Sequence, residues 1–374
     1  MVGFLKACLL VTITGSFFSC ISSTEQNRGK SRKQFVVDRR RSDVVSGDKI
    51  FLPEKTEISP ELPNWTNELL YLLENRAIYR NSVDWPTERQ ALIVAYKELA
   101  EQAKADQGKD EKSFRERIRT LIQRAGSRHS FFMSRHDLES FHQYEVKVDK
   151  STLENLTFHL LDDHLGLFSI GGYSGTDPLH DDELIKAAAH IIHQAESKHC
   201  KGLIIDLTSN GGGNMHPPLA SLSPILEDGD LGYFFYPNEK EKFAWRHNHG
   251  KIEIKIHNEV YLMAENKYHF QSTLRGLPIA VLISDHTASS GEFLALSLAS
   301  QKNTKTFGQK TFGLPTGNNS MFLSDGSMLI LTEALSVDTK GVTHDGPLSP
   351  DVTTETKTES INKAVQWIKS YERN

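Results

Sequence analysis

Ser289 lies in Thr287-Ala288-Ser289-Ser290-Gly291-Glu292, where an apolar run passes into a helical pattern. A serine at the start of a helix lies near free backbone N–H groups, which stabilise developing negative charge and so favour nucleophilic catalysis. The same serine could instead only cap the helix. Glu292, three residues later, fits a capping box better than a chemical role. This motif alone therefore leaves both roles of Ser289 open.

A glycine-rich loop, Asn210-Gly211-Gly212-Gly213-Asn214, follows another apolar run. Successive glycines let backbone N–H groups approach a ligand and form a concave anion site, which suits an oxyanion hole. A phosphate-binding loop is an alternative, but neither G-K-S/T nor G-x-G-x-x-G spacing is present. A flexible turn without chemistry remains the third interpretation.

A histidine at the end of the N-terminal helical region, His129 in Arg128-His129-Ser130, could act as a general base. Imidazole exchanges protons near neutral pH without a large change of its pKa. Because the chain has 16 histidines, residue type alone does not single out His129.

Helices and then alternating strands and helices are expected to position these segments. Helical patterns extend over residues 60–128, with Asn64 or Thr66 as candidate caps of the first helix and Gly126 ending the last. Apolar runs then predict strands at 153–161, 165–170, 202–207 and 277–284, and apolar periodicity predicts helices at 181–196, 290–300 and 361–371. Unbroken apolar runs are typical of strands buried on both faces, so the alternation indicates an α/β core.

The composition is that of an ordinary globular protein and excludes several function classes. The 374 residues are 38% hydrophobic and 24% charged, with a net charge of −5, so a basic nucleic-acid-binding protein is not expected. The three cysteines, Cys8, Cys20 and Cys200, include no C-x-x-C pair, which argues against a disulfide scaffold and a zinc site. We expect Cys200, next to an apolar run, to be a small buried residue.

The N-terminus predicts export. Residues 1–19 combine one early lysine with a short apolar core, which is typical of a signal peptide rather than a membrane span. Phe17-Phe18-Ser19-Cys20 resembles the cleavage box of bacterial lipoproteins, with Phe17 in place of leucine, so Cys20 is the expected lipidation site and plain secretion the alternative. Residues 20–57 are polar and basic and are expected to be a flexible tether. Contact of this tether with anionic lipid is a further alternative.

Five ordered motifs resemble those of the C-terminal processing (tail-specific) serine peptidases. Residues 202–213 are similar to G-x-I-I-D-L-R-x-N-x-G-G, 287–292 to T-A-S-A-S-E and 308–313 to G-E-K-T-F-G. Residues 325–329 are similar to D-G-S-x-L and 347–352 to G-I-x-P-D-V. His129-Ser130 adds a sixth, similar to the D-G-H-S segment of the branch with a histidine base. The resemblance implies that Ser289 is the nucleophile of a peptidase.

One departure changes the expected base. The lysine that follows T-F-G in the processing branch is Leu314 here, so the chain resembles the branch akin to the tricorn core protease and His129 becomes the implied base. Lys310 is the alternative. The carboxylate that orients such a histidine is implied shortly before the P-D-V segment, where Asp345 is the candidate and Glu333 a second choice. Asp206 is expected to be structural.

The resemblance implies a ClpP/crotonase-like α/β core at residues 136–374, preceded by a helical N-terminal cap at 58–135. Too few residues separate His129 from Asp206 for a PDZ domain. The implied reaction is peptide hydrolysis through an acyl-enzyme, with the N–H groups of Gly212 and Ser290 as the oxyanion hole and no metal or cofactor. Protein or peptide substrates are expected, at a bacterial cell envelope and facing the periplasm or cell exterior. Alternatives are a catalytically inactive peptide-binding lipoprotein and an acyl-CoA enzyme.

Overall fold

The computed structural model of this chain describes residues 57–104, 111–140, 156–161, 164–175, 178–268 and 271–371. The expected signal peptide, Cys20 and nearly all of the basic tether lie outside these residues. Within the described ranges, no helix has the length and apolar character needed to cross a membrane.

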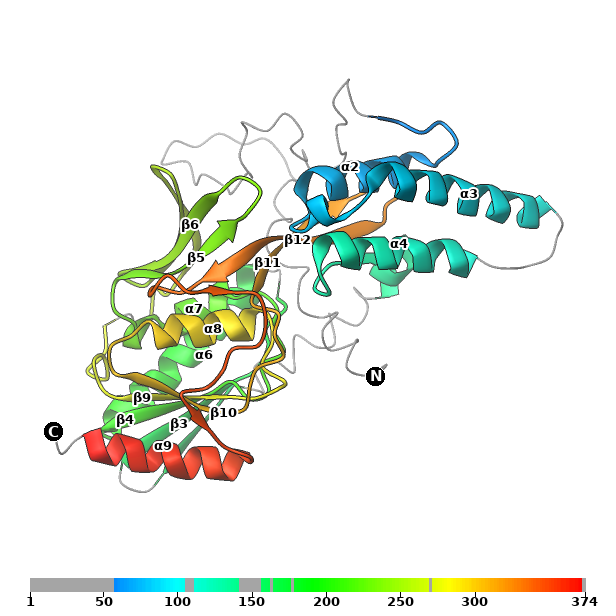
Figure 1. The fold of residues 1–374 in the computed structure, drawn as a ribbon. Coiled ribbons are helices and arrows are strands. Elements are labelled where there is room, and N and C mark those ends of the chain that lie inside the picture. Colours follow the sequence, from blue (N-terminus) through cyan, green and yellow to red (C-terminus); the bar gives the residue numbers. More distant parts are fainter. Residues whose placement is uncertain are drawn as a thin grey trace, which may run out of the picture.

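A six-stranded, mostly parallel sheet forms the base of the core (Figure 1). Its strands lie in the order β14 (Val352–Thr353), β10 (Thr304–Gly308), β9 (Ile279–Ile283), β4 (Gly202–Asp206), β3 (Leu165–Ile170) and β2 (Leu156–Leu161). Only β2 runs antiparallel to its neighbour. All residues of β4 and β9 are buried, as the unbroken apolar runs predicted.

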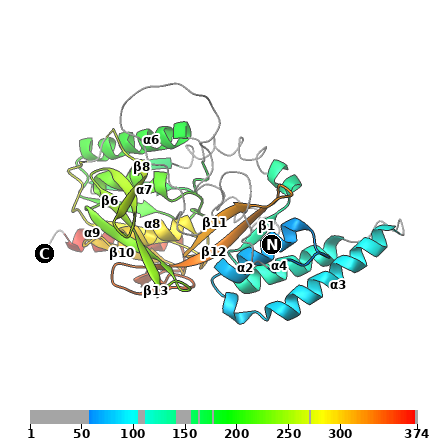
Figure 2. The same cartoon turned by 90° about the horizontal axis from the view of Figure 1, so that it is seen from above.

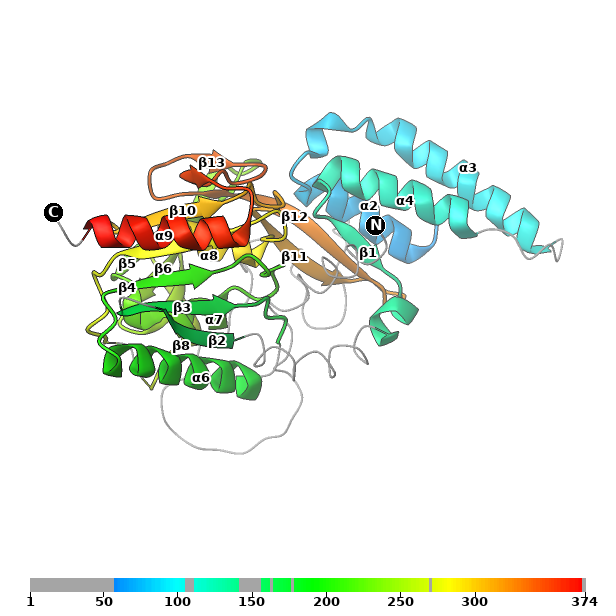
Figure 3. The same cartoon turned by 90° about the horizontal axis from the view of Figure 1, so that it is seen from below.

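Helices cover both faces of this sheet. Among the described helices, only the C-terminal helix α9 (Lys357–Tyr371) packs on the outer face, as Figure 3 shows. The other face carries α6 (Pro178–Ser197), α7 (His216–Leu222) and α8 (Ser290–Ala299). Neighbouring strand residues such as Ile204 and Ile205 alternate between the two faces and so enter two separate hydrophobic clusters.

A second, eight-stranded sheet was not predicted. Its path is β1 (Phe131–Met133), β12 (Met328–Val337), β5 (Gly229–Tyr236), β6 (Glu241–Asn248), β7 (Lys251–Ile256) and β8 (Glu259–Glu265), while β11 (Thr316–Phe322) and β13 (Thr343–His344) pair with β12. The helices α7 and α8 lie between the two sheets. Trp245 of β6 is fully buried against Phe293 of α8, and its indole N–H donates to Ser297 at 2.9 Å.

The N-terminal helical cap consists of α2 (Asn64–Arg76), the short 3-10 helix η1 (Arg80–Ser82), α3 (Trp85–Lys104) and α4 (Glu111–Gly126). Neither Asn64 nor Thr66 caps α2, because Pro63 occupies its N-cap position and no side chain there makes a capping hydrogen bond. Gly126 ends α4 as predicted.

The cap is not built from N-terminal residues alone. Its hydrophobic core includes four side chains of the β11–β12 hairpin: Met321, Leu323, Leu329 and Leu331. Figure 2 shows this hairpin reaching out from the core to the cap helices. A buried ion pair strengthens the contact, since Arg76 Nε of α2 lies 2.7 Å from Glu333 Oε1 of β12. The hairpin therefore joins the cap to the core.

Candidate active site

Three neighbouring strands place three loops at one edge of the parallel sheet. The strands β10, β9 and β4 are adjacent and parallel, so their carboxyl ends point to the same side. Ligands of open α/β sheets bind at this edge. The glycine-rich loop follows β4, the Ser289 turn follows β9 and residues 309–315 follow β10, so the candidate catalytic segments meet here.

Ser289 lies in a strained turn at the N-terminus of α8. Its φ of +51° and ψ of −117° fall outside the conformations that non-glycine residues normally adopt. Such strain persists only where the surroundings fix it, and it concentrates at functional sites. The backbone N–H of Ser289 donates to Glu292 Oε2 at 2.8 Å, which is the return half of a capping box. Helix capping and a strained nucleophile turn are therefore compatible here.

The glycine-rich loop packs directly against this turn. The Asn210 carbonyl accepts from the N–H of Ala288 at 3.0 Å. A Cβ on Gly291 would lie 2.4 Å from the same carbonyl, so the first turn of α8 has no space for a side chain at this position. Gly213 has a φ of +118°, and a Cβ there would lie 2.0 Å from the Tyr173 carbonyl. Glycine is thus required at both contacts.

The N–H of Gly212, an expected oxyanion donor, already has an acceptor. It donates to Asn210 Oδ1 at 3.0 Å, and the Asn210 amide in turn donates to the carbonyl of Gly171. In this conformation the N–H of Gly212 is therefore not available to an oxyanion, contrary to the expectation. Ser290 begins α8, and the first N–H groups of a helix have no intrahelical acceptor, so an oxyanion role of its N–H remains a prediction compatible with this position. Gly211 borders open space, with no atom near the position of its missing Cβ.

Glu292 connects the Ser289 turn to the loop after β10. Its carboxylate is fully buried and accepts four hydrogen bonds, from the N–H groups of Ser289, Gly313 and Leu314 and the hydroxyl of Thr311. Burial raises the pKa of Glu292 to about 7 in spite of these four donors, each of which lowers it. A second connection is the N–H of Phe312, which donates to the Thr287 carbonyl at 2.9 Å.

His129 is held by the beginning of β11. Its Nδ1 lies 2.7 Å from Thr316 Oγ1, and Asn318 Nδ2 donates to the His129 carbonyl at 3.2 Å. Its Nε2 is buried and has no hydrogen-bond partner among the described residues. Burial, with a smaller contribution from the Arg128 charge, lowers the pKa of His129 to about 3. The ring is therefore neutral and has one nitrogen available for a reacting group.

Arg128 binds the loop that Glu292 also binds. Its Nη2 donates to the carbonyls of Phe312 at 2.6 Å and Gly313 at 2.8 Å, and its guanidinium lies over the Phe312 ring. No hydrogen bond joins His129 to Ser289 in the part of the chain that the structure describes. Residues 311–316 connect them indirectly, because Thr316 contacts the His129 ring and Leu314 shares the Glu292 carboxylate with the N–H of Ser289.

The expected third residue lies elsewhere. Asp345 is exposed and accepts from the Tyr79 hydroxyl at 2.6 Å, whereas the Nδ1 partner of His129 is Thr316. Glu333 is buried and bonded to Arg76 and Asn319, so it faces the cap. The structure therefore brings neither carboxylate to His129, because the first is held by the cap and the second by a buried ion pair.

One alternative base and two structural expectations have clear outcomes. Lys310 is exposed, while Leu314 is buried at the position of the lysine base. Asp206 is bound by Lys357, 2.6 Å away, and by Thr208, in agreement with a structural role. Cys200 is buried, and burial raises the pKa of its thiol, as expected of an unreactive cysteine.

Sequence reasoning missed Thr316 and a further histidine, His216, whose ring nitrogen Nε2 is buried. Thr316 follows Leu314 and Pro315 without any motif of its own, so only the fold reveals its contact. His216 begins α7 just after the glycine-rich loop, its Nε2 is buried without a partner among the described residues, and burial lowers its pKa to about 4. A histidine so close to the glycine-rich loop is a rival to His129.

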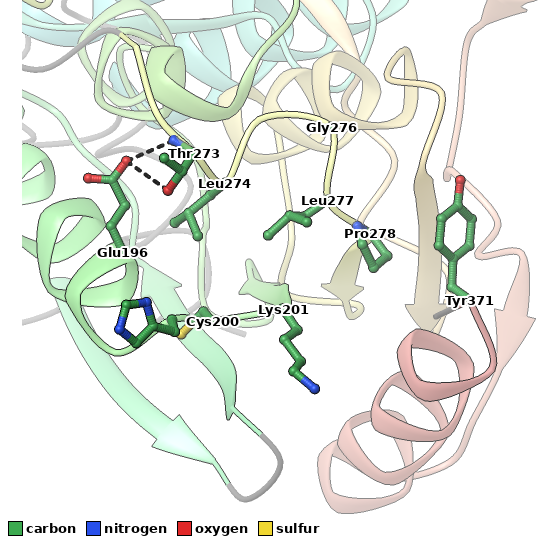
Figure 4. A pocket seen from close by; sticks show the side chains of 10 residues that line it. Glu196, Cys200, Lys201, Thr273, Leu274, Gly276, Leu277, Pro278 and Tyr371 are labelled. Carbon is green, nitrogen blue, oxygen red and sulfur yellow. Dashed lines mark hydrogen bonds between the residues drawn. The ribbon is translucent and has the colours of Figure 1, made fainter. Parts of the chain in front are cut away.

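A hollow of about 520 Å³ lies at the opposite edge of the parallel sheet (Figure 4). It is bordered by Lys201 and Pro278, which precede β4 and β9, and by Tyr371 at the end of α9. Because the candidate catalytic loops follow the carboxyl ends of these strands, this hollow is separate from the candidate site.

Residues 180–354, which include all three loops, match the model of peptidase family S41. The chain contains a peptidase S41 domain. The carboxy-terminal processing protease CtpA of Bacillus subtilis is 26% identical over 212 residues, which are 56% of this chain and 39% of that protein. The expected family resemblance is therefore confirmed.

Three further proteins are similar over most of the chain. The nisin-resistance protein of Lactococcus lactis subsp. lactis is 26% identical over 319 residues, 84% of this chain and 89% of that protein. A lipoprotein structure from Streptococcus agalactiae has a TM-score of 0.63 and 25% identity, covering 86% of this chain and 99% of that one. The photosystem II D1 C-terminal processing protease has a TM-score of 0.52 at 16% identity over 82% and 97% of the two chains, which shows a shared fold. The α/β fold with an N-terminal helical region is thus that of S41 peptidases.

Proposed function

We propose that the chain is a serine endopeptidase in which Ser289 is the nucleophile and His129 the general base. The observation that carries this proposal is the segment 311–316. Its Leu314 N–H shares the Glu292 carboxylate with the N–H of Ser289, and its Thr316 binds the His129 ring. Two residues of extended chain span only about 7 Å, so this segment holds the base and the nucleophile in one neighbourhood.

The proposed chemistry is acyl transfer. His129 Nε2 takes the proton of Ser289 Oγ as the oxygen attacks a peptide carbonyl carbon, and the imidazolium then gives that proton to the leaving amine. Water resolves the acyl-enzyme with the same histidine as base. The N–H of Ser290 stabilises the oxyanion, and Gly212 joins it when its N–H leaves Asn210. Donors of this kind contribute about 3–4 kcal/mol each.

A fluorophosphonate probe, which reacts with activated serines, tests this assignment on the full-length protein. We expect labelling of the wild type, none of Ser289→Ala, and a rate lower by about 10²-fold or more for His129→Gln. His216→Gln is the matched comparison, because the Nε2 of His216 is also buried and has no partner among the described residues. A loss with His216→Gln in place of His129→Gln would show that the base is misassigned.

The alternative is a catalytically inactive lipoprotein that uses the fold to bind peptides. The replacement of the lysine base by Leu314 and the lack of a carboxylate at His129 favour it. This alternative would be supported, and the peptidase excluded, if the probe does not label folded wild-type protein and this protein leaves unstructured peptides intact.

We further propose that the protein is anchored at the cell envelope through a lipid on Cys20. The signal-like N-terminus supports this, as does the likeness to the lipoprotein of Streptococcus agalactiae. Radiolabelled palmitate should enter the wild-type protein but not Cys20→Ala. Equal incorporation into both proteins would exclude Cys20.

A role in resistance to nisin is a second candidate, because the similarity to the nisin-resistance protein extends along nearly the whole of both chains. Incubation of nisin with the wild-type protein should give fragments that mass spectrometry detects, and Ser289→Ala should give none. Intact nisin in a reaction that cleaves other peptides would exclude this substrate while keeping the peptidase.

A further inference from the structure

The contact between Thr316 and His129 is short and buried. Thr316 Oγ1 lies 2.7 Å from His129 Nδ1, and the two residues are only 6% and 4% exposed. Water therefore competes little for either group, and the hydroxyl determines what this ring nitrogen does.

Two arrangements of protons fit this contact. When Nδ1–H donates to Oγ1, Nε2 carries a lone pair and can accept a proton. When the threonine hydroxyl donates to Nδ1, Nε2 carries the hydrogen and cannot act as a base. The buried Nε2 finds no acceptor among the described residues, so a hydrogen there would be left without a partner. An unpaired buried N–H is costly, and this disfavours the second arrangement.

We propose that Thr316 is a positioning residue that accepts the Nδ1–H of His129 and so holds the base in its active tautomer, in place of a carboxylate. This proposal rests on the proposed peptidase function. Thr316 itself is fixed by the sheet, since it pairs with Leu335 of β12 and the preceding Pro315 carbonyl accepts from Ser336.

A second contact from β11 supports the same role. Asn318 donates to the His129 carbonyl, so one strand binds both the backbone and the ring of the histidine. Asn318 is itself held by the Thr332 hydroxyl, which donates to its Oδ1 at 2.8 Å. The ring is thus oriented from a rigid hairpin rather than from a loop.

The test compares Thr316→Val, which keeps the shape but removes the hydroxyl, with Thr316→Ser, which keeps the hydroxyl. Thr354→Val is the control, because Thr354 is equally buried and bonded to Ser360 near the C-terminus. We expect the fluorophosphonate reaction to slow by about 10-fold or more in Thr316→Val and by less than about 3-fold in Thr316→Ser. The control should react like the wild type.

Nitrogen NMR of histidine-labelled full-length protein gives a readout that does not depend on peptidase activity. With the His129 signals assigned through His129→Gln, we expect the Nδ1–H tautomer in the wild type and in Thr316→Ser, and a mixture of tautomers in Thr316→Val. A wild-type Nε2–H tautomer, or a Thr316→Val protein that keeps the wild-type tautomer, overturns the proposal. If the probe labels nothing while the Nδ1–H tautomer depends on Thr316, the peptidase assignment fails and the positioning role stands.

Discussion

Glu292→Gln tests whether the carboxyl that holds the nucleophile turn titrates near neutral pH. Four donors favour its charged form and burial opposes it, and the balance places its pKa at about 7 in the folded protein against 4.5 for an ordinary glutamate. The folded chain then binds this proton more tightly than the unfolded chain. The resulting stabilisation is therefore complete below pH 4.5 and is lost as the pH rises through about 7.

The size of the effect follows from linkage. Between about pH 5.5 and about pH 8.5 the wild type should lose about 2 kcal/mol of unfolding free energy through this group. Glutamine has no proton to exchange, so Glu292→Gln lacks this loss. In the variant, an NH2 group replaces one carboxylate oxygen and faces the N–H groups that this oxygen had accepted. Leaving these buried donors without an acceptor costs about 1–3 kcal/mol at either pH. The difference in unfolding free energy between the wild type and Glu292→Gln should thus be about 2 kcal/mol larger, in favour of the wild type, at about pH 5.5 than at about pH 8.5.

Urea unfolding followed by tryptophan fluorescence at both pH values measures this difference. Glu98→Gln is the control, because it removes one exposed carboxyl on α3. If the difference between the wild type and Glu292→Gln stays constant within about 0.5 kcal/mol, Glu292 does not titrate in this range and the reasoning is wrong.

Two further substitutions test the supports of the site. Arg76→Met leaves Glu333 buried without its ion-pair partner and should destabilise the protein by about 3–5 kcal/mol in thermal unfolding. The double variant with Glu333→Leu should recover most of this loss. No recovery would show that the two residues are not coupled. Gly213→Ala places a Cβ against the Tyr173 carbonyl at positive φ and should cost at least about 1–2 kcal/mol and weaken probe labelling. Gly229→Ala, also at positive φ but with open space around it, should keep the labelling; equal loss in both would implicate backbone strain alone.

The parallel core could be predicted because its signals are local. Unbroken apolar runs end close to where β4 and β9 end, and the glycine-rich loop and the serine turn follow them directly. The antiparallel strands β5 to β8 were missed. They mix Lys, Glu and aromatic residues on half-buried surfaces, where burial by a distant helix rather than local sequence decides the structure.

The candidate site was predictable only in part, for a related reason. Ser289 and His129 lie in motifs that sequence spacing reveals. Thr316 carries no motif. Asp345 was inferred from its position shortly before the P-D-V segment, but in the structure Asp345 accepts a hydrogen bond from Tyr79 of the cap. Contacts between the cap and the core depend on which strands pair across long separations, and no local pattern encodes this pairing.

The β11–β12 hairpin also sets the order in which the chain can acquire a working site. During synthesis His129 emerges early and Ser289 much later, but the cap lacks part of its hydrophobic core until residues 321–331 have followed. The histidine ring gains its only described side-chain partner when residue 316 arrives. A growing or truncated chain that ends before the hairpin thus holds the proposed nucleophile and base in an incomplete framework.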